Sequence, residues 1–131
     1  MTTLFNGQIE TAAGTFEDPK TDGFGKVGSL TITYRFTYGS GGTGVDIYVQ
    51  TSIDGGITWW DIACTSFSTS TGNAYQSCTM SQISTPVALT DGTLTADTSI
   101  AGILGPMFRT KRVVTGAYAG TSLIVDVHAK T

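Results

Sequence analysis

The stretch that decides the fold is residues 29–64, SLTITYRFTYGSGGTGVDIYVQTSIDGGITWWDIAC. Apolar side chains take every second position from Leu30 to Tyr38, with threonines and one arginine between them. The same period of two returns from Val45 to Ile53. Such alternation is typical of strands with one buried face, because successive side chains point to opposite faces of a sheet. The two segments therefore predict two strands.

Outward from this stretch, the pattern continues as short strands and turns. A turn at residues 54–56 leads into a third strand over 57–64, because Asp-Gly between alternating segments is a strong hairpin signal. A polar loop is expected over 65–73 and a short strand over 74–80. One or two short strands follow before Pro106, and clear alternation returns over 107–114 and 123–129. With no helical period anywhere, the sequence predicts an all-β, antiparallel β-sandwich, jelly-roll-like, of about seven or eight strands.

The first 27 residues differ from the rest. Phe5, Ile9 and Phe16 are isolated apolar residues among glycines, threonines and acids. Residues 1–27 are interpreted as an extended N-terminal arm or an edge segment, and residues 28–131 as the sandwich domain. An arm would dock these three side chains on a neighbouring molecule, whereas an ordinary first strand and loop would keep them within this one.

Composition limits the classes of partner. Only 13% of the 131 residues are charged, about half the usual share of about 25%. The formal net charge of −3 argues against nucleic-acid binding by a basic field. No apolar run approaches the roughly 20 residues that span a bilayer, so no membrane partner is expected. The N-terminus lacks the features of a signal peptide, which indicates a chain used in a cytoplasm or seen in mature form.

One motif stands out within the decisive stretch. Residues 52–59 match the Asp-box pattern Ser-x-Asp-x-Gly-x-Thr-Trp through Ser52, Asp54, Gly56, Thr58 and Trp59. An aspartate accepts backbone N–H bonds of its own turn, and glycine adopts a positive φ that side chains resist. The hydroxyls are expected to tie the hairpin ends, and the indole to anchor the turn on the core. The motif therefore predicts a structural turn.

Catalytic and metal-binding patterns are not found in the sequence. The single histidine, His128, has no nucleophile beside it in the pattern, so no triad is expected. Asp46, Asp54, Asp61 and Asp126 lie on separate strands or turns, where structural roles suffice. One carboxylate in a glycine turn is a weak calcium site. We expect no enzyme activity, no metal and no cofactor.

Two cysteines, Cys64 and Cys78, leave two alternatives open. They could form a disulfide across neighbouring strands, closing a loop of about 15 residues. They could equally be two buried free thiols, as is usual in a reducing cytoplasm.

Further side chains are candidate partner contacts. Trp60 follows Trp59 on the same strand, so the two rings point to opposite faces, and an exposed Trp60 would contact a sugar or a protein. Arg109, Lys111 and Arg112 form the only basic cluster, with Arg112 on the opposite face. That cluster would meet an acidic partner surface, or it would be an ordinary solvated face.

The chain resembles small β-sandwich structural proteins of tailed bacteriophage virions. The resemblance rests on residues 29–33, 45–62, 107–114 and 122–127, roughly half of the chain, with the Asp-box hairpin and Trp60-Asp61-Ile62 at its centre. Proteins of that family decorate or cement the head, often as trimers, or belong to the neck or tail. The polar loop and the cysteine pair are not features of the resemblance.

The resemblance implies a capsid decoration or cement protein. Such a protein is made in the host cytoplasm, forms a homotrimer, binds the major capsid protein on the outer head surface, and stabilises the shell. The alternative is a carbohydrate-binding or host-adhesion module that uses exposed aromatics on host glycans. A neck or tail structural protein is the second alternative.

Overall fold

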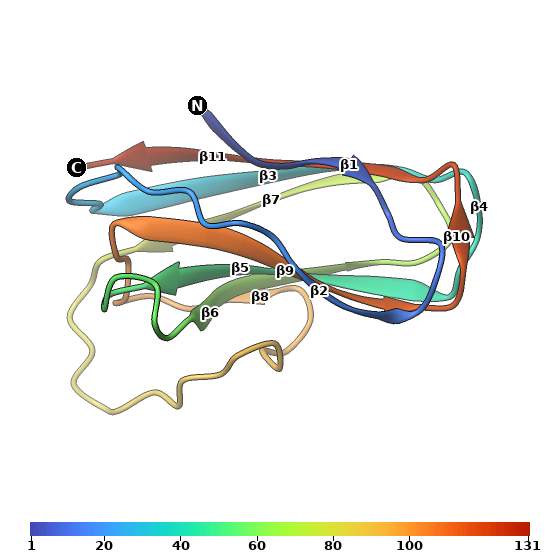
Figure 1. Cartoon of the computed structure of the whole chain (residues 1–131). Helices are drawn as coiled ribbons and strands as arrows, with labels where there is room; N and C mark the ends of the chain where they lie inside the picture. The colour runs from blue at the N-terminus through green and yellow to red at the C-terminus, as the bar shows by residue number, and fades with distance from the viewer.

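The computed structural model describes all 131 residues as an all-β sandwich (Figure 1). The strands are Thr2–Gln8 (β1), Gly14–Glu17 (β2), Ser29–Thr37 (β3), Ser40–Gly41 (β4), Gly44–Ser52 (β5), Trp60–Phe67 (β6), Gly72–Thr79 (β7), Thr98–Ser99 (β8), Met107–Thr115 (β9), Tyr118–Ala119 (β10) and Ser122–Lys130 (β11). One antiparallel sheet has the order β1-β11-β3-β7 and the other β2-β9-β5-β6-β8. The ribbon β10-β4 lies across one end of the sandwich (Figure 1).

The predicted fold class is confirmed. Eleven strands replace the expected seven or eight because β4, β8 and β10 are pieces of two residues each, which carry no readable alternation. The alternating side chains of β3 from Leu30 to Phe36 are fully buried. They pack against the inward side chains of β5, Val45, Ile47 and Val49, in a core cluster of 20 buried residues. The period of two therefore marks the buried face of each sheet, as the sequence indicates.

Strand boundaries around the expected polar loop were predicted wrongly. β6 begins at Trp60 rather than Ile57 and continues to Phe67, and β7 begins at Gly72. The extension has a packing reason: the Phe67 ring stacks on Phe36, with centroids 4.7 Å apart and planes 4° from parallel. The loop that joins the two sheets here is therefore only residues 68–71.

Residues 1–27 form edge strands of both sheets. β1 pairs with β11 in the four-stranded sheet, and β2 pairs with β9 in the five-stranded sheet, so the chain crosses the sandwich between them (Figure 1). Ile9 is 2% exposed, and Phe5 and Phe16 pack against the core. These three side chains, expected on a neighbour if the segment were an arm, contact this molecule instead because burial in its own core is available to them.

The crossing is fixed by Arg112 of β9. Its guanidinium donates to Glu10 at 2.7 Å and to Asp18, and it lies 3.9 Å from the centroid of the Phe5 ring. The Arg112 side chain is only 4% exposed. Burial alone would raise the pKa of Glu10, but the hydrogen bonds from Arg112 lower it overall. Arg112, predicted as a candidate partner contact, therefore forms ion pairs within the molecule instead.

Two free thiols, not a disulfide, occupy Cys64 and Cys78. Cys64 lies opposite Tyr48 in the β5–β6 register, and both side chains are on the outer face of the five-stranded sheet. Cys78 belongs to the core between the sheets. The Cys78 thiol donates to the Ile62 carbonyl at 3.5 Å. Burial raises the pKa of Cys64 to about 12 and that of Cys78 to about 11. The two sulfurs lie on different layers, which excludes the disulfide alternative in this fold.

Replacing Arg112 with alanine should destabilise the protein by about 3 kcal/mol, because Glu10 and Asp18 would lose their buried cation. Urea unfolding followed by tryptophan fluorescence measures the loss. Lys26, an exposed lysine, is the matched control, and Lys26→Ala should change the free energy of unfolding by less than about 0.5 kcal/mol. Equal losses in the two variants would contradict the account of the crossing.

Candidate functional site

The Asp-box residues form a tight turn between β5 and β6. Asp54 is its centre: Oδ1 accepts the Ser52 hydroxyl and the Thr58 N–H, each at 2.9 Å. Oδ2 accepts the Thr58 hydroxyl, and the Ser52 oxygen accepts the Gly56 N–H at 2.8 Å. Thr58 lies within the turn and not on the opposing strand, because β6 starts two residues later. The polar groups of the motif thus bond to one another.

Glycine and tryptophan complete the turn. Gly55 and Gly56 have φ values of 77° and 92°, which side chains rarely adopt. Trp59 is 8% exposed, and its indole N–H donates to the Gly56 carbonyl at 3.1 Å. The Arg109 guanidinium carbon lies 4.6 Å from the Trp59 ring centroid. The turn is therefore anchored to β9 through a cation–π contact.

Acid should loosen this turn selectively. The Thr58 hydroxyl and N–H, which donate to Asp54, lower its pKa to about 2. Because its pKa is lowered, ionised Asp54 stabilises the turn fully at pH values above the ordinary aspartate pKa near 4. This stabilisation is lost as the pH falls toward 2. The Thr58 and Gly56 amides should exchange faster below about pH 3 than a reference amide in β3, after correction for intrinsic rates. In Asp54→Asn the relative exchange rates should not change over this range, and an unchanged profile in wild type would contradict the assignment.

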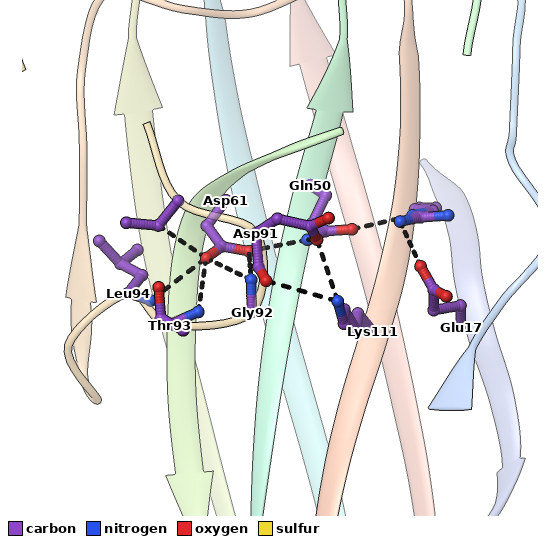
Figure 2. A network of polar contacts seen from close by, with 10 residues as sticks. Glu17, Gln50, Asp61, Asp91, Gly92, Thr93, Leu94 and Lys111 are labelled. Atoms are coloured by element: carbon purple, nitrogen blue, oxygen red, sulfur yellow. Dashed lines mark hydrogen bonds and ion pairs between the residues drawn. The ribbon is translucent and has the colours of Figure 1, made fainter. Parts of the chain in front are cut away.

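A second carboxylate, Asp61, organises the outer face of the five-stranded sheet. It is fully buried and accepts N–H bonds from Gly92, Thr93 and Leu94, the shortest at 2.8 Å, while its own N–H donates to the Thr90 carbonyl at 2.8 Å (Figure 2). The Thr90 hydroxyl also donates to it, at 2.8 Å. One carboxylate therefore satisfies the backbone of a whole turn that lies far along the chain.

Charged and amide side chains extend this network across the sheet. Gln50 is fully buried and donates to Asp61 at 2.8 Å and to Asp91 at 2.6 Å (Figure 2). Lys111 pairs with Asp91 at 3.0 Å. Partial burial opposes ionisation of Asp91, but the bonds from Gln50 and Lys111 lower its pKa overall. The network ties β6, β5 and β9 to the turn at residues 90–94.

Arg109 of β9 links the network to Glu17 of β2, the edge strand of the sheet. Its Nε donates to Oε1 of the Gln50 side chain at 2.8 Å, and its guanidinium pairs with Glu17 at 2.5 Å. The predicted division of the basic cluster is found: Arg109 and Lys111 belong to the outer face, and Arg112 to the inner. All three cations are paired within the molecule, so the cluster is not a free basic surface for an acidic partner.

The network holds down a long irregular segment, residues 80–97, here called the pinned segment. It runs beneath the five-stranded sheet as a wide yellow-to-orange loop (Figure 1). Its end is fixed by Asp97, whose Oδ1 accepts the Ser66 N–H at 3.1 Å. Met80, Ile83, Val87 and Leu89 are between 46% and 51% exposed along it. The segment therefore presents apolar side chains from a backbone attached at residues 90–94 and 97.

Trp60 is half-buried rather than exposed. It borders a hollow of about 370 Å³ beside the Asp box, together with Trp59, Glu17, Asp91 and Arg109. The charged groups of this hollow already pair with one another or with the network. Trp60 therefore presents part of its ring at this hollow and not a fully exposed face.

The remaining candidate residues are the single histidine and two further aspartates. His128 is exposed on β11, and Asp46 accepts the Ser66 hydroxyl. Asp126 pairs with Arg35 at 3.2 Å. No group of three or more His, Cys, Asp or Glu side chains lies close enough to hold a metal ion, and no helix has the length and hydropathy of a membrane span.

Sequence reasoning missed the role of Asp61 and the pinned segment. Asp61 was considered only as one of several aspartates, and the partners that it holds lie about 30 residues away. The visible signal was the run Thr90-Asp91-Gly92-Thr93, a turn composition that an acidic acceptor suits. Comparison with models of known families, with curated proteins and with solved structures gives no match to this chain.

Removing the Asp61 carboxylate should release the pinned segment. Asp61→Ala leaves three backbone N–H groups and a hydroxyl without their acceptor. If the free energy of local opening falls by about 2 kcal/mol, cleavage within residues 80–97 should be roughly 30-fold faster. Limited proteolysis with mass spectrometry measures the rate. Asp91→Ala, at a side chain 48% exposed, is the control and should accelerate cleavage less than about fivefold. Equal cleavage of wild type and Asp61→Ala would contradict the anchoring role.

Proposed function

We propose that this chain is a structural protein of a tailed-phage particle, a decoration or cement protein that binds the major capsid protein on the outer head surface. The observation that carries the proposal is the pinned segment, which exposes apolar side chains from a hydrogen-bonded attachment. The Asp-box hairpin and the resemblance it supports give the class of particle. Neither an activity nor a cofactor enters the proposal.

Exposure on the pinned segment favours a protein partner. Met80, Ile83, Val87 and Leu89 lie within one short stretch, and each keeps close to half of its surface in water. Apolar side chains that are exposed close together on a protein surface can mark a site of protein binding. Burial against a partner would recover about 25 cal/mol per Å² of apolar surface.

Attachment through Asp61 makes this surface suited to binding. A free loop loses conformational entropy when it is ordered at an interface, and this loss weakens association. Here the segment is already attached by Asp61 and Asp97 before any partner arrives. The cost of ordering residues 90–97 is therefore already included in the fold of the monomer.

Charge indicates the kind of surface that the segment fits. Residues 80–90 contain no charged side chain, and the nearby Asp91 is paired with Lys111. A neutral, partly apolar patch is complementary to an apolar patch on a protein shell. The basic cluster is internally paired, so the proposed docking does not depend on it.

The test is binding to heads of the source phage assembled without this protein. The double variant Ile83→Asp/Val87→Asp should lower affinity at least about 30-fold, because two charges would enter an apolar interface. Ile53→Asp/Ile57→Asp is the matched control: these isoleucines, 62% and 83% exposed, lie on the Asp-box turn and should leave affinity within about threefold. Co-sedimentation over a range of protein concentrations measures both.

Unchanged binding of the Ile83/Val87 variant, with its circular dichroism intact, would contradict docking through the pinned segment. Recovery of the protein with purified necks or tails instead of heads would favour the neck or tail alternative. Binding to a glycan array that is lost in Trp60→Ala would favour the host-adhesion alternative.

A further inference from the structure

The four sheet edges differ in how they are protected from pairing with other chains. β1 has a bulge between Thr3 and Phe5, β2 has four residues and ends at Glu17, and β8 has two residues. β7 has eight residues, GNAYQSCT, without charge or proline, and pairs with β3 without a register shift. A regular, uncharged edge of this length is a template for another strand.

The register with β3 shows which backbone N–H and C=O groups of β7 have no hydrogen-bond partner in the sheet. The Met80 N–H donates to the Gly28 carbonyl at 2.8 Å, in line with the β3–β7 register, so the even-numbered residues bond to β3. The odd-numbered residues therefore direct their N–H and C=O groups away from the sheet. The Gly102 N–H donates to the Thr79 carbonyl at 2.8 Å, and the Ser99 hydroxyl donates to the Ser77 carbonyl at 3.2 Å. Asn73 and Tyr75 remain open.

The side chains at this open stretch also lack a partner. Tyr75 is 79% exposed, the largest aromatic exposure in the chain. It borders a hollow of about 510 Å³ on the outer face of the four-stranded sheet, with Arg35, Asn73 and Asp126. Arg35 is directly opposite Asn73 in the register, so a ring placed beyond Asn73 would lie beside the guanidinium.

We propose that β7 pairs antiparallel with β7 of a second copy of this chain, about a two-fold axis at Ala74. In that register Asn73 of each copy faces Tyr75 of the other, and the two pairs form four backbone hydrogen bonds. The two four-stranded sheets become one sheet of eight strands. Each Tyr75 ring lies over the other copy's Asn73, beside Arg35 and the hollow.

Self-pairing suits this strand better than pairing with another edge. An uncharged strand meets its own copy without like-charge repulsion, and one two-fold contact satisfies the open residues of both copies at once. Pairing of β7 with β1 of a second copy would meet the bulge at Thr3/Phe5, which interrupts a regular ladder. This inference is independent of the proposed docking to heads.

A cysteine at the axis tests the register. At the two-fold axis, residue 74 of one copy lies opposite residue 74 of the other, at a non-hydrogen-bonded position. The two Cα atoms would be about 4.5 Å apart, which is within the range of a disulfide. Ala74→Cys should form a linked dimer under mild oxidation. Ser77→Cys is the control: its two copies would lie roughly 20 Å apart, so it should stay unlinked. No linkage of Ala74→Cys, or equal linkage of both variants, would overturn the proposal.

Proline at the open edge tests the pairing without an added cysteine. Tyr75→Pro removes an N–H that does not bond to β3, so the variant should fold, and light scattering should give 13.7 kDa where wild type gives twice that mass. Asn6→Pro makes the same change on the β1 edge and should remain dimeric. A dimeric Tyr75→Pro, or a trimeric or monomeric wild type up to millimolar concentration, would overturn the proposal.

A further measurement applies if Tyr75→Pro fails to fold. In wild type, the amides of Asn73 and Tyr75 should exchange more slowly as protein concentration rises, while the Asn6 amide should not change. Exchange at Asn73 and Tyr75 that is independent of concentration would overturn the pairing. So would glycan binding by a monomer that is lost in Tyr75→Ala.

Discussion

Hydrogen bonding to the Asp61 carboxylate is the interaction on which attachment of the turn at residues 90–94 depends. Eighteen residues of irregular chain, 80–97, follow β7, and their bonds to the five-stranded sheet are made by residues 90–94 and Asp97. A backbone without ladder partners needs other acceptors. Asp61 accepts three consecutive N–H groups and a hydroxyl, and Gln50 joins it to the charged groups of β9. Without this acceptor, the turn at residues 90–94 would lose its carboxylate attachment to the sheet.

The molecule uses the same physical solution at the Asp box. Asp54 accepts N–H and hydroxyl bonds within its own exposed turn, and the buried Asp61 accepts them from a turn about 30 residues away. Two further carboxylates, Glu10 and Asp18, hold the N-terminal crossing through Arg112. Acidic residues that could suggest chemistry are thus engaged in holding segments that lack regular pairing. The apolar side chains of the pinned segment and the open edge of β7 are the two surfaces proposed to meet other molecules.

Local patterns predicted the sandwich and the Asp-box turn, because alternation and turn chemistry are properties of neighbouring residues. The same patterns could not show that Phe67 continues β6 by stacking on Phe36, or that Arg112 is buried, since both depend on partners distant in the chain. The free thiols of Cys64 and Cys78 follow from their layers, which spacing does not reveal. Asp61 was missed for the same reason: its partners at residues 90–94 become neighbours only after folding.

The most direct test of this account is hydrogen exchange of the protein free and mixed with purified tailed-phage heads, the partner that the proposed function names. The account predicts that binding slows exchange in residues 80–90 and leaves the Asp-box turn at residues 53–58 unchanged. Protection confined to the Asp-box turn or to β2, with residues 80–90 exchanging at the free rate, would contradict it.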